Sequence, residues 1–369
     1  MIPAARLAHL RPSPIRALSE GAPPDAVPMG LGEPGWDLPL PAVEALARFS
    51  GPCAYGPNAG LPELQEAVGA FHGTPARDVL LTAGSQGALF ALTQAYAEPG
   101  DAVLVPDPGF LAYPALARIA GAEPVPYPLG PGFGLDADLF RAALDAAPRA
   151  RLALVNHPGN PTGAGCSRAA LAEVAEACAR RGVLLVSDEV YRDLRLGDPA
   201  PSLRDVTQGG IVLGSVSKAW GAPGLRVGWA LGEAPLLAPA RLVHAYMVTA
   251  PARTSQLAAL ALVRESGAVL AQAREHLRAR WEAFSEAFAR HFGQVPQHGA
   301  GGFYHWLALP PGADPMPFCL RLRDEGRVVV VPGQAFGERG RGFVRLSYAG
   351  DPALIREGVR RLAPFWSTP

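Results

Sequence analysis

The chain has 369 residues, of which 49% are hydrophobic and 18% charged, and its 33 basic and 33 acidic side chains give a formal net charge of zero. A neutral chain without a Lys/Arg-rich block lacks the basic surface that binds nucleic acid or an anionic membrane, so we expect neither as a partner. The apolar stretches are too short to span a membrane, no apolar signal core is evident, and no Cys/His spacing suits a metal. Four widely separated cysteines favour a reduced, cytoplasmic protein.

The first two thirds of the chain alternate between helix and strand patterns. Residues 1–45 are rich in Pro and Gly and are predicted to form an irregular arm that ends in a helix-like stretch. Helices are then predicted at 61–71, 86–97, 110–120 and 167–181, and strands at 78–82, 102–105, 151–155, 183–187 and 211–215. Continuously apolar strands between amphipathic helices are typical of a parallel sheet that helices cover on both faces.

The pattern changes after Pro251. A long helix rich in Arg and Glu is predicted over 255–292, with a break near Gly267. Short strands at 303–309, 327–331 and 342–347 and a closing helix at 352–362 follow, which is an α+β pattern. We therefore predict three parts: an arm (1–45) that joins the smaller domain, a large α/β domain (46–254) and a small C-terminal α+β domain (255–369).

Two short motifs suggest other chemistry without the context that it needs. The sequence from Gly30 to Gly35 matches GxGxxG, but prolines surround it, so no crossover helix begins there as a dinucleotide site requires. The SxxK sequence that ends at Lys218 is typical of serine β-lactamases, which also need a second lysine in a KTG element. This chain has no second lysine, and Ala219 follows Lys218, which also excludes a phosphate-binding P-loop.

A third motif keeps an alternative reaction class open. Ala83 to Gly87 resembles a hydrolase nucleophile elbow and lies at a predicted strand-to-helix turn. A serine hydrolase would use Ser85 as its nucleophile and would need a later histidine, for which His298 and His305 are the candidates.

Lys218 is the only lysine, which leaves 32 arginines among the 33 basic residues. A biased composition explains why lysine is scarce elsewhere. Arginine keeps its proton in proteins, whereas lysine can lose it and become a nucleophilic amine. Because Schiff-base chemistry needs such an amine, we interpret Lys218 as the candidate catalytic residue.

The surroundings of Lys218 suit a cofactor that carries an aldehyde and a phosphate. Ser215 and Arg226 flank Lys218 in SVSKAWGAPGLR, where a glycine-rich turn follows a strand. Asp188 and Asn160 each follow another predicted strand, at the sheet edge where parallel α/β folds bind ligands. The GSQG turn opens a helix, and a helix N-terminus is a favourable site for phosphate.

Together these elements resemble the class I/II aminotransferases, fold type I enzymes that use pyridoxal 5′-phosphate (PLP). The likeness covers nearly the whole chain, and its motifs occur in family order: GLGEPGWDLP, YGPNAGLPELQEAV, LLTAGSQGALFAL, PDPGFLAYP, NPTG, SDEVY, SVSKAWGAPGLRVG and FVRLSYA. The resemblance implies a large domain with a mostly parallel sheet between helices and a smaller α+β domain. It also implies transfer of an amino group from an L-amino acid to a 2-oxo acid, by a ping-pong route through pyridoxamine phosphate.

The resemblance further implies roles for single residues. Lys218 would form the internal aldimine and then move a proton between Cα and C4′, while Asp188 would pair with the pyridine nitrogen. Arg345 would clamp the substrate α-carboxylate, with Gly32 and Asn160 close to the substrate. The other expected contacts are Tyr191 and Asn160 at the phenolic oxygen, Ser85, Gln86, Ser215 and Arg226 at the phosphate, Phe110 on the ring, and Tyr55 at the phosphate of the neighbouring subunit of a homodimer.

The motifs leave the reaction and its substrate partly open. A PLP-dependent β-lyase or decarboxylase on the same fold is the nearest alternative. Phe110 also stands where the aspartate-specific subgroup has a tryptophan, so the amino donor does not follow from the resemblance.

Overall fold

The structure is a computed structural model that describes residues 4–8, 10, 12 and 14–367; the rest of the expected arm lies outside the described residues. Its centre is a seven-stranded sheet with the order β2-β8-β7-β6-β5-β3-β4. The strands are β2 (Val79–Thr82), β3 (Ala102–Asp107), β4 (Glu123–Pro128), β5 (Ala150–Asn156), β6 (Leu184–Asp188), β7 (Ile211–Ser215) and β8 (Gly228–Leu231). Only β8 runs antiparallel to its neighbours, so the predicted mostly parallel sheet is confirmed.

Strands β4 and β8 were not predicted from the sequence. The sequence of β4 is EPVPYP, and its alternating prolines hide the strand pattern. Proline lacks a backbone donor and is therefore tolerated mainly at a sheet edge, which is where β4 lies. The sequence of β8 is GWAL, which is short and follows the glycine-rich turn after Lys218.

Helices cover both faces of the sheet, because alternate strand residues enter two separate apolar clusters. On one face, Leu80, Val186 and Leu213 pack with residues of α4, α5 and α8. On the other, Leu81 and Leu185 pack with residues of a second group of helices. The first group is α4 (Gly84–Tyr96), α5 (Ala112–Ile119) and α8 (Ala234–Val248); the second includes α3 (Pro62–His72), α6 (Ala137–Asp145), α7 (Arg168–Arg180) and α9 (Arg253–Arg264).

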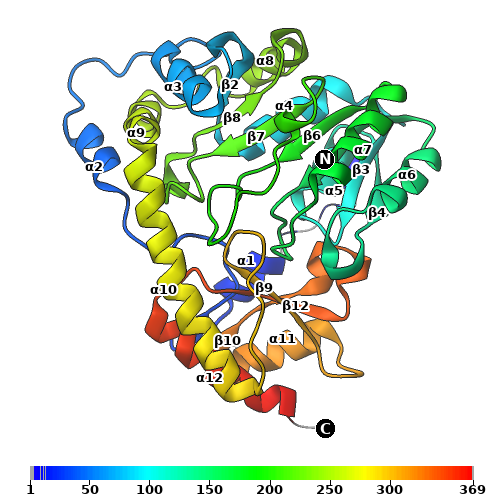
Figure 1. Cartoon of the computed structure of the whole chain (residues 1–369), viewed down its shortest axis with the longest axis vertical. Coiled ribbons are helices and arrows are strands. Elements are labelled where there is room, and N and C mark those ends of the chain that lie inside the picture. Colours follow the sequence, from blue (N-terminus) through cyan, green and yellow to red (C-terminus); the bar gives the residue numbers. More distant parts are fainter. Residues whose placement is uncertain (1–3, 9, 11, 13, 368–369) are drawn as a thin grey trace.

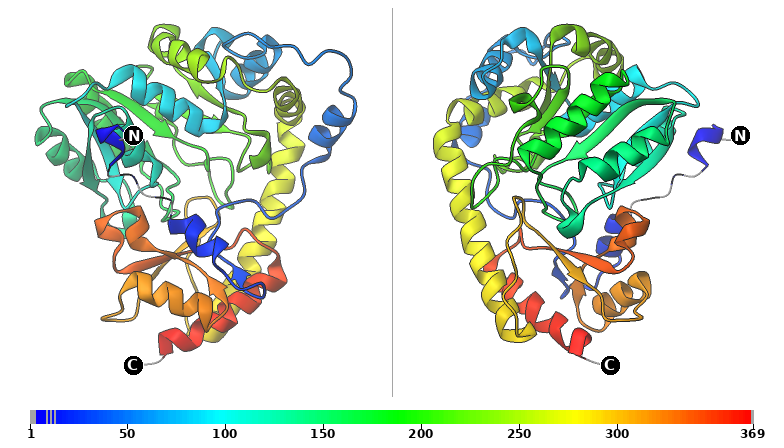
Figure 2. Two further views of the ribbon diagram at one scale, coloured as in Figure 1. Left: turned by 180° about the vertical axis from the view of Figure 1, so that it is seen from behind. Right: turned by 45° about the vertical axis from the view of Figure 1, so that its right-hand side comes forward.

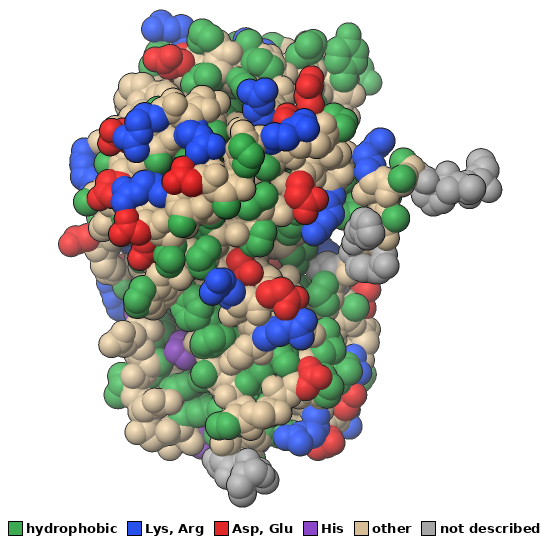
Figure 3. Space-filling model, turned by 90° about the vertical axis from the view of Figure 1, so that its right-hand side faces the viewer, with side chains coloured by type: hydrophobic (Ala, Val, Ile, Leu, Met, Phe, Trp, Pro, Cys, Tyr) green, Lys and Arg blue, Asp and Glu red, His purple; other side chains and the backbone are tan. Residues whose placement is uncertain are grey.

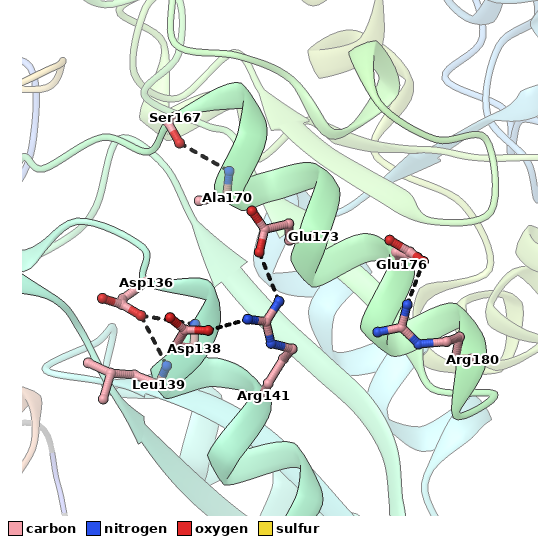
Figure 4. A network of polar contacts seen from close by, with 9 residues as sticks. All are labelled: Asp136, Asp138, Leu139, Arg141, Ser167, Ala170, Glu173, Glu176 and Arg180. Atoms are coloured by element: carbon pink, nitrogen blue, oxygen red, sulfur yellow. Dashed lines mark hydrogen bonds and ion pairs between the residues drawn. The ribbon is translucent and has the colours of Figure 1, made fainter.

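Local capping fixes where two outer helices begin (Figure 4). The Asp136 carboxylate accepts hydrogen bonds from the first backbone N–H groups of α6, and the Ser167 hydroxyl accepts one from Ala170 in α7. Arg141 of α6 then pairs with Glu173 of α7 at 2.8 Å. This pair is exposed, so we expect it to contribute less to stability than the caps do.

A second group of strands combines the two ends of the chain. β1 (Val27–Pro28) pairs in parallel with β10 (Val328–Val329), and β11 (Val331–Pro332), β12 (Phe343–Ser347) and β9 (Tyr304–Ala308) form a three-stranded antiparallel sheet. One strand was predicted over 327–331, but this segment forms two short strands, because its two halves pair with different partners. α11 (Pro315–Asp324) and α12 (Pro352–Ser367) accompany these strands.

The long predicted helix is two helices, α9 and α10 (Ser266–Phe292), and the break falls at Glu265, close to the predicted break near Gly267. In Figures 1 and 2, α10 runs along one side of the molecule from the large sheet to the smaller strands. The arm is not wholly irregular, since it contains η1 (Ala5–Leu7) and α1 (Pro14–Glu20), which lies beside the smaller strands, and α2 (Leu40–Ala47) follows near α3 and α9.

The surface matches the balanced charge of the sequence. On the face shown in Figure 3, acidic and basic side chains are interspersed with apolar and neutral ones. Among the described residues, no helix has the length and apolarity needed to cross a membrane.

Candidate active site

A cavity of about 670 Å³ lies at the carboxyl ends of the parallel strands, between the large sheet and the smaller group of strands. Residues from α1, α4, β6 and β12 share its wall. All but two of the predicted site residues line it: Gly32, Ser85, Gln86, Phe110, Asn160, Asp188, Tyr191, Lys218, Arg226 and Arg345. The structure thus brings together segments that are more than 300 residues apart in the chain.

The Lys218 amine projects into this cavity from the turn after β7. Its Nζ donates a hydrogen bond of 2.6 Å to the carbonyl of Gly32, and it lies 5.6 Å from the centre of the Tyr191 ring. Burial lowers the pKa of the Lys218 amine, and the positive charges of Arg345 and Arg226 act in the same direction. A lower pKa makes the unprotonated, nucleophilic amine more accessible at neutral pH.

A buried carboxylate faces the same cavity. Asp188 ends β6, is 4% exposed, and accepts a hydrogen bond of 2.8 Å from the hydroxyl of Tyr113. Burial raises the pKa of Asp188 to about 6, although the Tyr113 hydrogen bond favours the charged form. Among the residues described, no cation forms an ion pair with Asp188. Such a carboxylate is suited to a cationic group of a bound molecule.

The opposite wall is a site for an anion. α4 begins at Gly84, so its free backbone N–H groups point into the cavity beside Ser85 and Gln86. The Arg226 guanidinium packs against this helix start, because a Cβ atom added to Gly84 would lie 2.5 Å from Arg226 Nη2. Gly84 also has φ +71°, a backbone conformation that favours glycine. A helix N-terminus next to a guanidinium attracts phosphate strongly.

Two predicted residues lie off this wall. Ser215 is 1% exposed, and its hydroxyl contacts Ser217 Oγ at 2.7 Å and donates to the Val227 carbonyl at 2.9 Å. Ser217 lines the cavity in its place, and the sequence reading had not singled it out. Tyr55 is 89% exposed and does not line the cavity of its own chain.

Arg345 forms the second cationic site. It is 2% exposed, with Nη1 donating to Asn160 Oδ1 at 2.7 Å and Nη2 donating to the Gly30 carbonyl at 2.6 Å. The guanidinium lies between two rings, 4.4 Å from the centre of Tyr304 and 4.8 Å from that of Phe336. Its buried Nε has no acceptor among the described residues. These contacts orient the guanidinium for a carboxylate.

Two further groups, Asn156 and Tyr304, support the site and were not predicted from the sequence. The side-chain oxygen of Asn156, at the end of β5, accepts a hydrogen bond of 2.8 Å from the backbone of Asn160 and so fixes the NPTG turn. The hydroxyl of Tyr304 lies 2.8 Å from that of Tyr191. Asn156 lies four residues before Asn160, the first residue of the NPTG motif, which was a usable signal, whereas nothing local marked Tyr304.

Comparison with known proteins identifies the family. The family model for aminotransferase class I and II matches residues 25–362. The chain belongs to the class I and II aminotransferases. It is therefore an enzyme that moves an amino group from an amino acid to a 2-oxo acid.

Several curated relatives align along most of this aminotransferase. The aspartate aminotransferase of Pyrococcus horikoshii is 29% identical over 97% of this chain and 96% of its own. The arginine–pyruvate transaminase of Pseudomonas aeruginosa is 31% identical over 91% of this chain and 88% of its own. The solved aspartate aminotransferase from Thermus thermophilus with maleate matches with a TM-score of 0.90 and 30% identity, covering 99% of this chain and all of that one.

The aminotransferase family and fold are PLP-dependent, and the cavity fits this cofactor. Asp188 offers a buried anion for a protonated ring nitrogen. The Gly84 cradle, Arg226 and the start of α4 offer a phosphate site. Neither His298 nor His305 lines the cavity with Ser85, so both candidate histidine bases of the hydrolase alternative lie away from its nucleophile. His298 contacts Trp281 and the Gly299 carbonyl instead.

Proposed function

We propose that this aminotransferase binds PLP in the cavity at the carboxyl ends of β5, β6 and β7 and works by a ping-pong route through pyridoxamine phosphate. The observation that carries the proposal is the position of Lys218. The only lysine of the chain places its amine inside this cavity, beside a buried carboxylate and an anion site. When bound, PLP supplies an aldehyde that reacts with amines and a protonated ring that accepts electrons.

We assign the phosphate to the start of α4. The backbone N–H groups of Ser85 and Gln86 and the Ser85 hydroxyl would donate to it, and the Arg226 guanidinium would balance its charge. Ser215 would act through Ser217, since their hydroxyls are 2.7 Å apart and Ser217 faces the cavity.

We assign the ring to the space between Phe110 and the strand ends. Asp188, which the Tyr113 hydroxyl holds in place, would keep the ring nitrogen protonated. Phe110 would cover one face of the ring, while Tyr191 and Asn160 would donate to its phenolic oxygen.

The substrate would bind with its α-carboxylate on Arg345, close to Gly32 and Asn160. This binding would bring the substrate Cα near the Lys218 amine, whose lowered pKa suits it to take a proton from that carbon and deliver it to the C4′ carbon of the bound cofactor. A β-lyase or decarboxylase, the alternative that the sequence left open, would use the same amine and the same carboxylate clamp but would release ammonia or CO₂ instead of passing the amino group to an oxo acid.

We further propose a cytoplasmic homodimer in which Tyr55 reaches the phosphate of the partner. Exposed apolar side chains gather on α2 and α8, including Leu40, Val43, Leu242 and Tyr246, and Tyr55 is itself exposed. All four cysteines are free, which suits a reducing compartment. Sedimentation velocity on the PLP-loaded protein tests the dimer; a fully active monomer would refute it.

The proposed three-part division (1–45, 46–254 and 255–369) is supported by the position of the sheets. The seven-stranded sheet falls entirely within 46–254, whereas β9 to β12 fall in the last part and β1 in the first.

The decisive experiment uses the single lysine. Protein loaded with PLP and reduced with borohydride should carry the cofactor mass on the peptide that contains Lys218. No other side-chain amine exists in the chain, so the modified site is unambiguous. Lys218→Arg should lose the adduct and at least about 10⁴-fold in turnover. An unmodified Lys218 in an active preparation would refute the proposal.

A second assay separates the alternatives. Incubating the PLP-loaded protein with single amino acids and no oxo acid should consume one equivalent of donor per site. Adding 2-oxoglutarate or pyruvate should then restore continuous turnover. Catalytic release of ammonia or CO₂ without an oxo acid would favour the lyase or decarboxylase instead.

A further inference from the structure

Tyr304, the first residue of β9, lies against three residues that line the cavity: Tyr191, Arg345 and Gly32. Its hydroxyl lies 2.8 Å from the Tyr191 hydroxyl, and its ring centre lies 4.4 Å from the Arg345 guanidinium carbon. The same hydroxyl occupies the space beside Gly32, because a Cβ atom added there would lie 1.8 Å from it. The missing side chain of Gly32 therefore makes room for Tyr304, while the Gly32 carbonyl accepts the Lys218 hydrogen bond.

The direction of the hydrogen bond between the two hydroxyls decides what Tyr191 can do. Each hydroxyl has one hydrogen to donate. If Tyr191 donated to Tyr304, no hydrogen would remain for an electron-rich oxygen in the cavity. If Tyr304 donates, the hydrogen of Tyr191 is free to point into the cavity that Tyr191 lines. Among the described residues, neither hydroxyl has another hydrogen-bond partner, and only donation by Tyr304 leaves the Tyr191 hydrogen for a group in the cavity.

We propose that Tyr304 is a positioning residue: its hydroxyl donates to Tyr191 and turns the Tyr191 hydrogen toward the cofactor, and its ring holds Arg345 ready for the substrate carboxylate. The inference rests on the proposed function, since it assumes PLP in the cavity. Burial raises the pKa of Tyr191 well above its ordinary value, so this hydroxyl keeps its proton and remains a donor at neutral pH.

Two substitutions separate the hydroxyl from the ring. Tyr304→Phe keeps the ring against Arg345 and removes only the hydrogen bond. Tyr191 should then donate a weaker hydrogen bond to the phenolic oxygen of the bound cofactor, so the cofactor should lose its titratable proton only at a higher pH. The pH midpoint of its visible absorbance should therefore rise by about 0.5–1 pH unit. The KM for the amino donor should change less than about twofold. Tyr304→Leu also removes the ring, so its KM should rise by a further factor of about 3–10.

A double-mutant cycle shows whether Tyr304 acts through Tyr191. Tyr191→Phe should shift the midpoint upward at least as far as Tyr304→Phe does. If the path runs through Tyr191, adding Tyr304→Phe to Tyr191→Phe should leave the midpoint where Tyr191→Phe put it. Additive shifts, or an unchanged midpoint in Tyr304→Phe, would overturn the proposal.

Tyr96→Phe is the matched control. The Tyr96 hydroxyl donates to the Leu236 carbonyl at 2.7 Å and does not line the cavity. Tyr96→Phe should lower the free energy of unfolding without moving the pH midpoint of the cofactor absorbance. Wild-type protein that binds no PLP would instead contradict the proposed function, whereas a normal wild-type titration with an unaffected Tyr304→Phe would contradict only the role of Tyr304.

Discussion

The cavity has two ends with different origins. The end that we assign to the cofactor is built by turns that directly follow sheet strands: Asp188 ends β6, Lys218 follows β7, and Gly84 follows β2. The end that we assign to the substrate carboxylate joins the arm to the last strands. There, Arg345 of β12 bonds to the carbonyl of Gly30, 315 residues earlier in the chain.

This difference teaches which contacts each function depends on. At the cofactor end, each functional residue is positioned by a single strand and by the turn that follows that strand. At the carboxylate end, Arg345 depends on the Gly30 carbonyl of the arm. The Lys218 amine of the cofactor end also reaches the arm, at the Gly32 carbonyl. Asn160 connects the ends, since its backbone is held by Asn156 and its side chain by Arg345. We therefore expect damage at each end to affect a different kinetic constant.

The largest effect should come from Arg345→Lys. Lysine cannot reproduce the planar pair of donors, and one of the two partners Asn160 and Gly30 would lose its hydrogen bond. We expect the KM for donor and acceptor to rise by about 100-fold, which corresponds to roughly 2–3 kcal/mol. The Kd of PLP, measured by absorbance titration of the cofactor-free protein, should stay within about twofold.

Arg341→Lys is the control for this change. Arg341 is exposed and pairs with Glu338, outside the cavity, so its replacement should alter neither constant. A loss of PLP affinity in Arg345→Lys comparable to its loss of substrate affinity would show that the two ends are not separable.

Gly84→Ala should have a smaller effect, and it should weaken the binding of PLP rather than that of the substrates. The new Cβ would meet Arg226 Nη2 at 2.5 Å, and φ +71° is strained for alanine. We expect the Kd of PLP to rise by about 10- to 30-fold, since strain of 1–3 kcal/mol falls on the phosphate site. The KM for substrates, measured at saturating PLP, should be nearly unchanged.

Gly73→Ala separates backbone strain from damage to the site. Gly73 ends α3 with φ +64°, and nothing lies within 4 Å of its added Cβ atom. It should lower stability by about 1 kcal/mol while PLP affinity is retained. Equal loss of PLP affinity in both variants would mean that Gly84 acts only through overall stability.

The same comparison explains what the sequence could and could not predict. Local patterns predicted the positions of Asp188, Lys218 and Arg226, because each lies close to an apolar strand or a glycine-rich turn. Parallel strands end at the same edge of a sheet, which brings these residues together. The position of Tyr304 was not predicted, because its partners Gly32, Tyr191 and Arg345 come from three other segments. Its own surroundings read only as a strand.

The prediction of the fold from the sequence was limited in the same way. The parallel core strands were predicted from their continuous apolar runs. β4 was missed because its prolines mask it, and residues 327–331 were read as one strand although Val328 pairs with the arm and Val331 with β12. Pairing partners far along the chain cannot be read from a local pattern.

The smallest effect should come from Tyr113→Phe at the cofactor end, and it should depend on pH. In the cofactor-free protein, burial raises the Asp188 pKa from 3.8 to about 6. The folded state then binds more protons than the unfolded state between these values. The contribution of Asp188 to stability is therefore largest below about pH 4, falls as the pH rises toward 6, and levels off above it.

The Tyr113 hydroxyl favours the charged carboxylate, so removing it should raise the Asp188 pKa further. Tyr113→Phe should thus lose about 1 kcal/mol of unfolding free energy at pH 8 and clearly less at pH 4.5, as measured by urea denaturation. The raised pKa of Glu189, about 7, gives a slope of the same sign, but it is present in both proteins and cancels in the difference. Tyr96→Phe, which loses a bond to a neutral carbonyl, should cost the same at both pH values. A pH-independent loss in Tyr113→Phe would mean that its hydroxyl serves packing rather than the charge that the cofactor end keeps for the ring nitrogen.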